Sequence, residues 1–281
     1  MPAQACPVCL HGAARFARSA ELGPGRARDI HECPDCGAAF YLPAPSAEDI
    51  ARCRPPAGSG ALFKRYWRDY YRGRALARRL SGWRTSGDFL HAGCALGTML
   101  AGLRDHSNWR ARGLEPSARA AELGRVLNGA DIASVPLCEA PYPQESFDYV
   151  LLDEVLEREP SPRAAMAGVA RLLRPGGRLE LIVPDGPLGR AGSLFFFSRR
   201  SLLGLLADFK LRVLSLRRSR SSRGAGDEAA GELSLEQGRA LIGPAPSWPL
   251  YLWGDRLRRL WRFPGRALGG DFGIIAEKPA A

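Results

Sequence analysis

The sequence has no run of about 18 apolar residues, which is the length that a membrane-spanning helix requires. The N-terminal stretch also lacks the apolar core of a secretion signal. These two absences exclude a transmembrane span and make the cytoplasm of a bacterium the expected location. A chain of 281 residues, of which 46% are hydrophobic and 25% charged, can form one large core and a small accessory unit.

Lysine is scarce and occurs only at Lys64, Lys210 and Lys278, so nearly all of the positive charge comes from arginine. The net charge of +11 suits a nucleic acid or an anionic membrane surface. Abundant arginine, alanine, glycine and proline are also what a GC-rich genome produces without any selected partner. Because the basic residues are mostly dispersed along the chain, a nucleic-acid partner is an alternative that the composition does not favour.

Two C-x-x-C pairs lie near the N-terminus, separated by about two dozen residues. This spacing is typical of a four-cysteine zinc ribbon, here over residues 1–42, in which each pair presents two thiolates to one tetrahedral ion. Disulfides are disfavoured in a reducing compartment, and a redox pair needs a thioredoxin-like context that is absent here. We therefore expect a closed, structural Zn²⁺ site. Its ligands are Cys6, Cys9, Cys33 and Cys36.

Residues 43–85 are expected to connect the ribbon to the main domain. Prolines and glycines interrupt regular structure over 43–60. An aromatic and basic stretch over 62–83 has apolar residues at the spacing of one buried helical face. The connection therefore consists of a linker followed by an amphipathic helix.

A glycine-containing turn is the most informative stretch of the chain. Gly93 and Gly97 lie between an expected strand over 89–92 and an expected helix that begins at Thr98. Glycines at such a turn let the backbone approach a ligand, and the helix N-terminus offers it unpaired N–H groups. The pattern indicates the first βα turn of a nucleotide-binding α/β fold. A dinucleotide fingerprint is broken, because Ala95 and Thr98 occupy its second and third glycine positions.

Expected strands and helices alternate from residue 86 to residue 217. The strands are 88–92, 109–114, 131–135, 147–152, 177–183 and 211–217, and the helices are 97–106, 117–128, 161–173 and 199–208. This alternation predicts an α/β fold, with a doubly wound parallel sheet in a domain over residues 86–281.

Further motifs follow the glycine turn at fixed distances. They are Glu115 after the strand over 109–114, Ser146-Phe147-Asp148-Tyr149-Val150, the expected short helix Glu154-Val155-Leu156-Glu157, and Leu172-Leu173-Arg174-Pro175-Gly176-Gly177. Together these motifs resemble the class I S-adenosylmethionine-dependent methyltransferase family. The resemblance covers about residues 86–217 and the last dozen residues. It implies a seven-stranded Rossmann-like sheet whose last, antiparallel strand is 272–276.

The resemblance also implies a cofactor site around the glycine turn. The expected S-adenosylmethionine-binding residues are His91, Gly93, Ala95, Gly97, Glu115 and Leu137. Glu115 takes the place of the carboxylate that accepts from both ribose hydroxyls, and Leu137 packs on the adenine ring. In that family a segment before the first strand lies over the cofactor. Tyr66, Tyr70 and Tyr71 are therefore candidate pocket walls, and packing of their helix on the sheet is the alternative.

Three departures from the family pattern weaken this site. His91 stands where the family has an acid, Ala95 replaces the middle glycine, and the acid that binds the adenine amino group is absent near Pro136. Each lost charged hydrogen bond costs about 1.5–3 kcal/mol, roughly ten- to a hundredfold in affinity. A degenerate, non-catalytic binding or scaffold protein that keeps the fold is therefore an alternative.

Asp153 and Glu154 are the candidate catalytic residues. They follow the expected strand over 147–152, and ligands collect at the carboxyl ends of strands in open α/β sheets. Some quinone and phenol O-methyltransferases of this shape carry Glu-x-x-Glu-His here and hold a divalent metal. Glu157 completes the acidic pair, but Arg158 replaces the histidine and cannot ligate a metal. No second metal is expected.

Residues 218–270 form an expected insertion before the last strand. Within it, residues 248–263 combine aromatic residues and arginines in the pattern of an amphipathic helix. Three interpretations remain open for this segment: packing on the sheet, lining an apolar substrate pocket, and peripheral contact with an anionic membrane.

The sequence therefore predicts methyl transfer from S-adenosylmethionine to a small or lipid-linked metabolite, such as a sugar in surface-polysaccharide or secondary metabolism. RNA methylation is the alternative enzyme function, and it requires salt-sensitive RNA binding.

Overall fold

The computed structural model describes residues 5–23, 26–46, 49, 65–185, 192–220, 235–243 and 270–280. The chain divides into two compact units. The first covers Met1–Pro55, Leu137–Ser222 and Gly269–Ala281, and the second covers Pro56–Pro136 and Arg223–Leu268. The amphipathic helix expected over 248–263 lies outside the described residues. The domain boundaries expected from the sequence stay a prediction.

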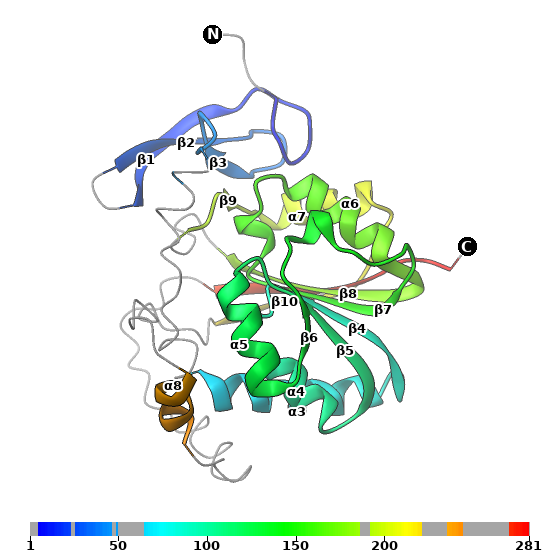
Figure 1. Ribbon diagram of the computed structural model, residues 1–281. Helices are drawn as coiled ribbons and strands as arrows, with labels where there is room; N and C mark the ends of the chain where they lie inside the picture. Colours follow the sequence, from blue (N-terminus) through cyan, green and yellow to red (C-terminus); the bar gives the residue numbers. More distant parts are fainter. Residues whose placement is uncertain are drawn as a thin grey trace. The chain divides into compact units, whose positions relative to one another are not determined.

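The second unit contains three parallel strands with helices packed against them. Its elements are α3 (Tyr66–Ser81), β4 (Ser86–Ala92), α4 (Thr98–Arg104), β5 (Asn108–Leu114), α5 (Ala118–Asn128), β6 (Asp131–Ala133) and α8 (Leu235–Ile242). β5 pairs in parallel with β4 on one side and with β6 on the other (Figure 1). Helix α4 lies between β4 and β5 in the chain, and α5 lies between β5 and β6, as the alternation in the sequence predicts.

Helices α3 and α4 pack backbone to backbone through two glycines. A Cβ at Gly73 would lie 2.1 Å from the carbonyl oxygen of Met99, and one at Gly102 would lie 2.0 Å from that of Tyr70. A side chain at either position would push the helices apart, so glycine is required there despite its low helix propensity. The buried face of α3 confirms the predicted apolar stripe over Tyr66–Ser81, and residues 62–64 of the predicted helix lie outside the described residues.

The first unit contains the N-terminal ribbon and the remaining strands. Its elements are β1 (Arg15–Gly23), β2 (Arg26–Glu32), β3 (Ala39–Tyr41), the 3₁₀ turn η1 (Leu137–Glu139), β7 (Phe147–Asp153), the 3₁₀ turn η2 (Leu156–Arg158), α6 (Pro162–Leu172), β8 (Leu173–Asp185), β9 (Phe195–Phe196), α7 (Arg199–Asp208), β10 (Arg212–Arg220) and β11 (Gly270–Glu277). All seven residues of β7 are buried. Five of these residues are apolar or aromatic and two are aspartates, so β7 is a strand covered on both faces that also buries two carboxylates.

The main sheet has seven strands, in the order β10-β11-β8-β7-β4-β5-β6. β11 runs antiparallel to both β8 and β10, which confirms the last strand expected from the sequence. A second sheet has the order β1-β2-β3-β9 and joins the ribbon to a short strand that the sequence did not predict.

Two local predictions are wrong in detail. The strand expected over 177–183 begins at Leu173, because the backbone at Gly176 and Gly177 exchanges hydrogen bonds of 2.7 and 2.9 Å with Lys278 and so remains in the ladder. The short helix expected over 154–157 is a 3₁₀ turn over Leu156–Arg158. Glu154 has a φ of 58°, and a left-handed residue cannot be part of a right-handed helix.

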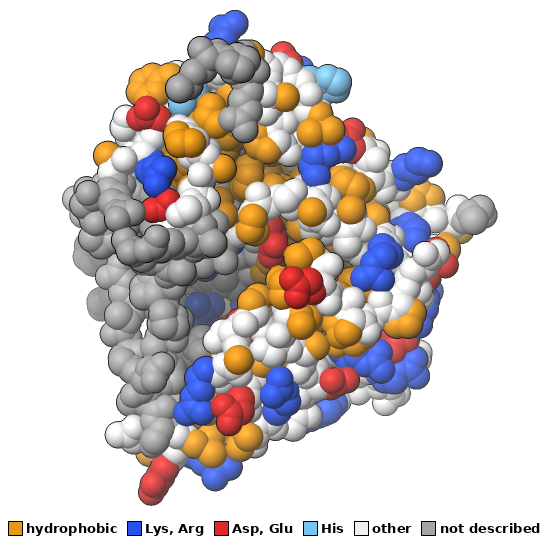
Figure 2. All heavy atoms as spheres, turned by 45° about the horizontal axis from the view of Figure 1, so that its top comes forward, with side chains coloured by type: hydrophobic (Ala, Val, Ile, Leu, Met, Phe, Trp, Pro, Cys, Tyr) orange, Lys and Arg blue, Asp and Glu red, His pale blue; other side chains and the backbone are white. Residues whose placement is uncertain are grey.

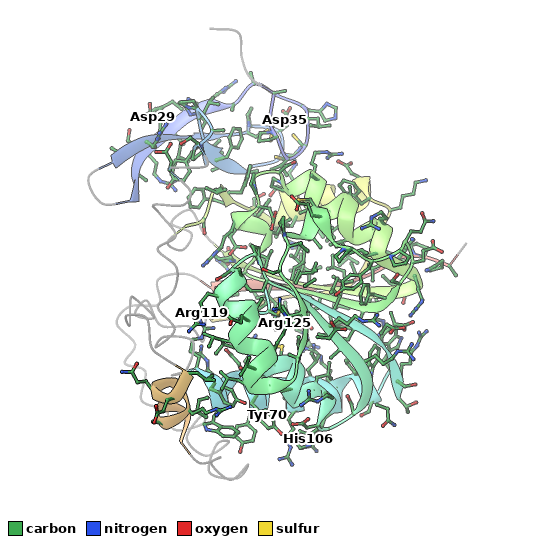
Figure 3. The ribbon with its side chains drawn as sticks, in the orientation of Figure 1. Asp29, Asp35, Tyr70, His106, Arg119 and Arg125 are labelled. Atoms are coloured by element: carbon green, nitrogen blue, oxygen red, sulfur yellow. The ribbon has the colours of Figure 1, made fainter. Side chains whose placement is uncertain are left out.

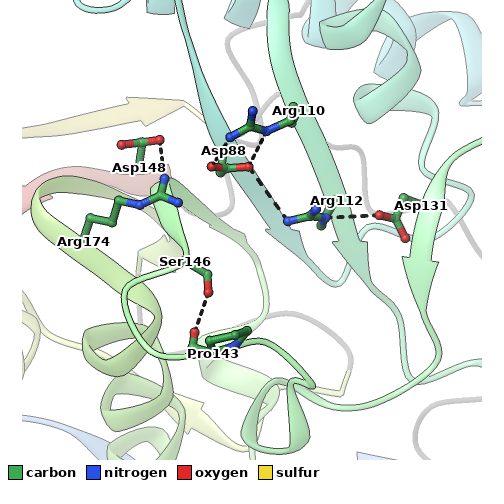
Figure 4. A network of polar contacts seen from close by, with 8 residues as sticks. All are labelled: Asp88, Arg110, Arg112, Asp131, Pro143, Ser146, Asp148 and Arg174. Atoms are coloured by element: carbon green, nitrogen blue, oxygen red, sulfur yellow. Dashed lines mark hydrogen bonds and ion pairs between the residues drawn. The ribbon is translucent and has the colours of Figure 1, made fainter.

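Two buried aspartates are paired with arginines within their own units (Figure 4). Asp88 of β4 accepts hydrogen bonds of 2.8 and 2.7 Å from Nε and Nη2 of Arg110 on β5. Asp148 of β7 accepts one of 2.7 Å from Arg174 on β8. Such pairing satisfies carboxylates that would otherwise destabilise the sheet.

Charges of both signs are distributed over the face shown in Figure 2. Arginine and lysine side chains alternate there with acidic ones, so the net positive charge does not form a single patch on that face. None of the helices in the described part of the chain is long and apolar enough to cross a membrane.

Candidate functional site

The turn between β4 and α4 contains three left-handed residues at alternating positions. Gly93 has a φ of 71°, Ala95 of 50° and Gly97 of 62°. Ala95 thus adopts the conformation that a glycine would adopt at the middle position. The left-handed conformation costs a residue with a Cβ roughly 1–2 kcal/mol, so this backbone path is maintained against a local cost.

Glu115, which follows β5, holds this turn in place. Its Oε2 accepts a hydrogen bond of 2.9 Å from the backbone N–H of Ala95, and its Oε1 accepts one of 2.9 Å from that of Ser117. The backbone N–H groups of Gly93 and Cys94 both donate to the carbonyl oxygen of Leu114, at 2.8 and 3.1 Å. The two oxygens of this carboxylate thus connect the turn at Ala95 to the start of α5 at Ser117.

Two glycines of this region also have packing roles. A Cβ at Gly97 would lie 2.9 Å from Cβ of Ala130 and from Cδ1 of Ile132. A Cβ at Gly113 would lie 2.4 Å from Sγ of Cys94. Gly97 is therefore required by its positive φ and by its contact with the start of β6. Gly113, whose importance the sequence did not signal, leaves space for the Cys94 thiol.

His91 is the second-last residue of β4 and lies opposite Gly113 in the parallel register. Only 6% of it is exposed. The structure thus places a buried imidazole where the related family has an acid. A neutral or charged ring can replace a carboxylate as a hydrogen-bonding group but not as an anion.

A buried amide connects the aromatic helix to the glycine turn. Asn128, the last residue of α5, donates a hydrogen bond of 2.7 Å through Nδ2 to the carbonyl oxygen of Leu96. Its Oδ1 accepts one of 2.5 Å from the Tyr66 hydroxyl. Sequence reasoning missed Asn128, and the signal available was an asparagine directly before the Gly129 helix end.

The three tyrosines of α3 are engaged within the second unit. Tyr71 is 5% exposed, and the Tyr70 hydroxyl donates to Asp105 at 3.1 Å. Figure 3 shows Tyr70 beside His106, and their rings are 5.9 Å apart. These contacts support the packing interpretation, and a role of the tyrosines as pocket walls stays a prediction.

Three buried acids lie at the end of β7 and just after it in the first unit. Asp153 and Glu154 are each 8% exposed, and Glu157 is 1% exposed. Burial raises the pKa of Glu157 from 4.5 to about 8; the Arg158 guanidinium partly offsets this rise, and the charges of Glu154 and Asp153 add to it. Nε of Arg158 lies 3.6 Å from Oε1 of Glu157. Glu157 is therefore predominantly protonated at neutral pH.

Leu137, the expected adenine contact, lies in η1 and is 2% exposed. A Cβ at Gly168 of α6 would lie 3.6 Å from the Leu137 carbonyl oxygen, so the two elements are in close contact. Contact of Leu137 with an adenine ring stays a prediction.

The four N-terminal cysteines form one cluster, in which the sulfur atoms lie within 4.8 Å of one another. The Cys6 and Cys36 sulfurs are 3.7 Å apart, as are those of Cys9 and Cys33. A tetrahedron with Zn–S bonds of about 2.3 Å has edges of about 3.8 Å, so the donor set fits a zinc ion. Burial raises the pKa of Cys6 to about 11, and a bound cation would stabilise its thiolate.

Comparison with known proteins gives a family and a fold. A family model described as a methyltransferase domain matches residues 65–216. No curated protein sequence matches this chain.

Three solved structures illustrate the likeness. 1,6-didemethyltoxoflavin-N1-methyltransferase of Burkholderia thailandensis, with bound S-adenosylhomocysteine, has a TM-score of 0.52, 15% identity, and coverage of 94% of this chain and 100% of that one. Geranyl diphosphate C-methyltransferase of Streptomyces coelicolor has a TM-score of 0.50 and 16% identity, and the match covers 73% of this chain and 80% of that one. The cyclase SpnF has a TM-score of 0.52 and 19% identity, and the match covers 74% of this chain and 80% of that one. At these identities the likeness shows the fold alone.

Proposed function

We propose, because this chain belongs to the methyltransferase-domain family, that it transfers a methyl group from S-adenosylmethionine to a small or lipid-linked metabolite. The observation that carries this proposal is the turn at Gly93, Ala95 and Gly97, with the Glu115 carboxylate bonded to it. The turn keeps the backbone path that a cofactor requires, even though one of its glycines is an alanine.

We assign the cofactor-binding roles from the family resemblance. Glu115 binds the ribose hydroxyls through its carboxylate, which also accepts from the N–H groups of Ala95 and Ser117. The backbone at Gly93 and Gly97 adjoins the methionine end, where His91 supplies a polar ring in place of an acid. Leu137 provides apolar contact for the adenine ring. S-adenosylmethionine supplies an electrophilic methyl group on a sulfonium ion.

The acceptor must be oriented for in-line attack, and an acceptor that carries a proton must also lose it. Asp153 and Glu154 at the carboxyl end of β7 are the proposed groups for holding the acceptor and taking its proton. Glu157 does not serve as the base at neutral pH, because its raised pKa keeps it protonated. The pH dependence of turnover can therefore reveal whether Glu157 takes part.

The proposed substrate class is supported only by the kinds of substrate that structural relatives use. The structural relatives named above include enzymes whose titles give 1,6-didemethyltoxoflavin and geranyl diphosphate as substrates, both small molecules. An RNA acceptor is the alternative, and the mixing of acidic with basic side chains in Figure 2 does not favour it. Since a cyclase also shares this fold, a binding or scaffold role without methyl transfer is the remaining alternative.

The ribbon is proposed to hold one structural Zn²⁺ through Cys6, Cys9, Cys33 and Cys36. All four positions of a tetrahedral ion are then filled by protein, which leaves no open site for chemistry. The zinc therefore stabilises the ribbon and takes no part in methyl transfer.

Calorimetric titration with S-adenosylhomocysteine tests the enzyme proposal. We expect a dissociation constant of about 10–500 μM, equivalent to roughly 4.5–7 kcal/mol, because the turn has lost an acid and a glycine. Absence of both binding heat and a thermal shift at millimolar ligand would refute the enzyme and favour the scaffold. If the protein binds S-adenosylhomocysteine and also binds RNA in a salt-sensitive way, RNA becomes the favoured methyl acceptor.

A further inference from the structure

Strand β9 of the first unit belongs to the ribbon sheet although it lies more than a hundred and fifty residues after the ribbon. It pairs antiparallel with β3, with Ala39 opposite Phe196 and Phe40 opposite Phe195. The Phe40 and Phe195 rings are 6.2 Å apart, and all these side chains are at least nine-tenths buried. The ribbon and the segment around β9 therefore share one hydrophobic interface (Figure 1).

Ser198, two residues after β9, links this segment to the second C-x-x-C pair, Cys33 and Cys36. Its hydroxyl donates a hydrogen bond of 2.7 Å to the carbonyl oxygen of Cys36, and it also caps α7 by accepting one of 3.0 Å from the N–H of Ser201. A Cβ at Gly37, whose φ is 71°, would lie 3.2 Å from the Ser198 hydroxyl. The backbone at the second C-x-x-C pair is thus in direct contact with the start of α7.

The same segment is bonded on its other side to the acid-containing turn. The backbone N–H of Leu194 donates a hydrogen bond of 2.7 Å to the carbonyl oxygen of Glu157. Glu157 belongs to η2, which directly follows Asp153 and Glu154. Residues 194–198 therefore connect the carbonyl oxygen of a zinc-ligand cysteine to the carbonyl oxygen of Glu157, through β9 and Ser198.

We propose that the zinc ribbon positions the acid-containing turn after β7, with β9 and Ser198 as the connection. The metal-binding loops of a four-cysteine ribbon lose their fixed structure without the ion. Metal loss would therefore release the Cys36 carbonyl oxygen from Ser198 and then release β9. The backbone at Glu157 would lose the partner that fixes it. This inference rests on the proposed zinc site and on the proposed role of Asp153 and Glu154, and it gives the ribbon a function at the acceptor-binding side of the enzyme.

Amide hydrogen exchange, measured residue by residue by NMR on the full chain, tests this connection. The Leu194 N–H reports on it, and the Glu145 N–H, which donates to the carbonyl oxygen of Arg171 at 2.8 Å before the start of β7, is the reference in the same unit. Removing zinc with a chelator should accelerate exchange at Leu194 about tenfold or more and leave Glu145 within about twofold. Unchanged exchange at Leu194 after zinc removal, or equal acceleration at both amides, would overturn the proposal.

Two serine substitutions distinguish the effect of the Ser198–Cys36 hydrogen bond from the effect of helix capping. Ser198→Asp keeps a side-chain acceptor for the cap but cannot donate to Cys36. Ser161→Asp makes the same change at the cap of α6, where the Ser161 hydroxyl accepts from the N–H of Ala164. We expect zinc transfer to a chromophoric chelator to be roughly fivefold faster in Ser198→Asp and unchanged in Ser161→Asp. Equal rates in the two variants would contradict the connection.

The outcomes remain separable from the proposed function. A wild-type protein that binds S-adenosylhomocysteine but shows no zinc-dependent change at Leu194 would retain the enzyme proposal and reject the positioning role. A wild-type protein with the zinc-dependent change but no cofactor binding would retain the connection and reject the enzyme.

Discussion

The Glu115 carboxylate accepts a hydrogen bond of 2.9 Å from the backbone N–H of Ala95. This contact joins the residue that the family uses for ribose to the altered position of the glycine turn. One side chain therefore holds the left-handed turn in place, and the same side chain is the group that we propose to bind the ribose hydroxyls.

Replacing Glu115 should weaken cofactor binding and loosen the turn. We expect Glu115→Ala to weaken S-adenosylhomocysteine binding about tenfold or more, since charge-assisted bonds to ribose are lost. The free energy of unfolding should also fall by about 1–2 kcal/mol, because Ala95 and Ser117 lose an acceptor. Calorimetry and urea unfolding measure the two effects. Glu122→Ala, on the exposed face of α5, is the control that should leave binding unchanged.

Ala95→Gly should stabilise the protein. Glycine adopts a φ of 50° without the clash that Ala95 carries, although it adds entropy to the unfolded chain, so we expect a net gain of up to about 1 kcal/mol in urea unfolding. Ala101→Gly in α4 is the matched control and should destabilise by about 1 kcal/mol. Equal destabilisation by both changes would show that Ala95 is not strained. Tighter S-adenosylhomocysteine binding in the double variant His91→Asp, Ala95→Gly would identify these two residues as the cause of weak affinity.

Zinc content should depend on the four clustered cysteines and on no other thiol tested. We expect about one zinc equivalent in the wild-type protein and less than roughly half of one in Cys36→Ser, because a tetrahedral site needs all four thiolates. Cys138→Ser removes an exposed thiol outside the cluster and should leave the zinc content unchanged. Elemental analysis of purified protein measures both, and less than half an equivalent in the wild type itself would reject the zinc site.

Glu157 should make a contribution to stability that is lost as the pH rises from about 4.5 to about 8. Its folded pKa lies above its unfolded value of 4.5, so the unfolded chain releases this proton in that range while the folded protein keeps it. The folded state binds more protons there, and the free energy of unfolding decreases by up to about 1.4 kcal/mol per pH unit from this group. Urea unfolding between pH 5 and 8 should show a shallower decrease in Glu157→Gln. An identical slope in both proteins would mean that the carboxyl is not buried in a neutral form.

Local sequence signals predicted the helices and strands whose apolar residues recur at a regular period. The alternation of apolar strands and helices located β4 to β8 within a few residues, because each element buries its own apolar residues at its own period. The C-x-x-C pairs identified the cysteine cluster for the same reason, since two ligands of each pair are adjacent in sequence. The family resemblance identified the seven-stranded sheet and its antiparallel last strand.

The tertiary structure alone decided which distant residues meet. No periodicity indicates that the two residues of β9 pair with β3, that Ser198 donates to Cys36, or that Asn128 bridges Tyr66 and Leu96. Likewise, the sequence shows Glu157 as one acid among three, and its raised pKa arises from the burial that packing imposes. These contacts depend on how separate elements pack, and packing energy is summed over partners far apart in the chain, where local propensity carries no information.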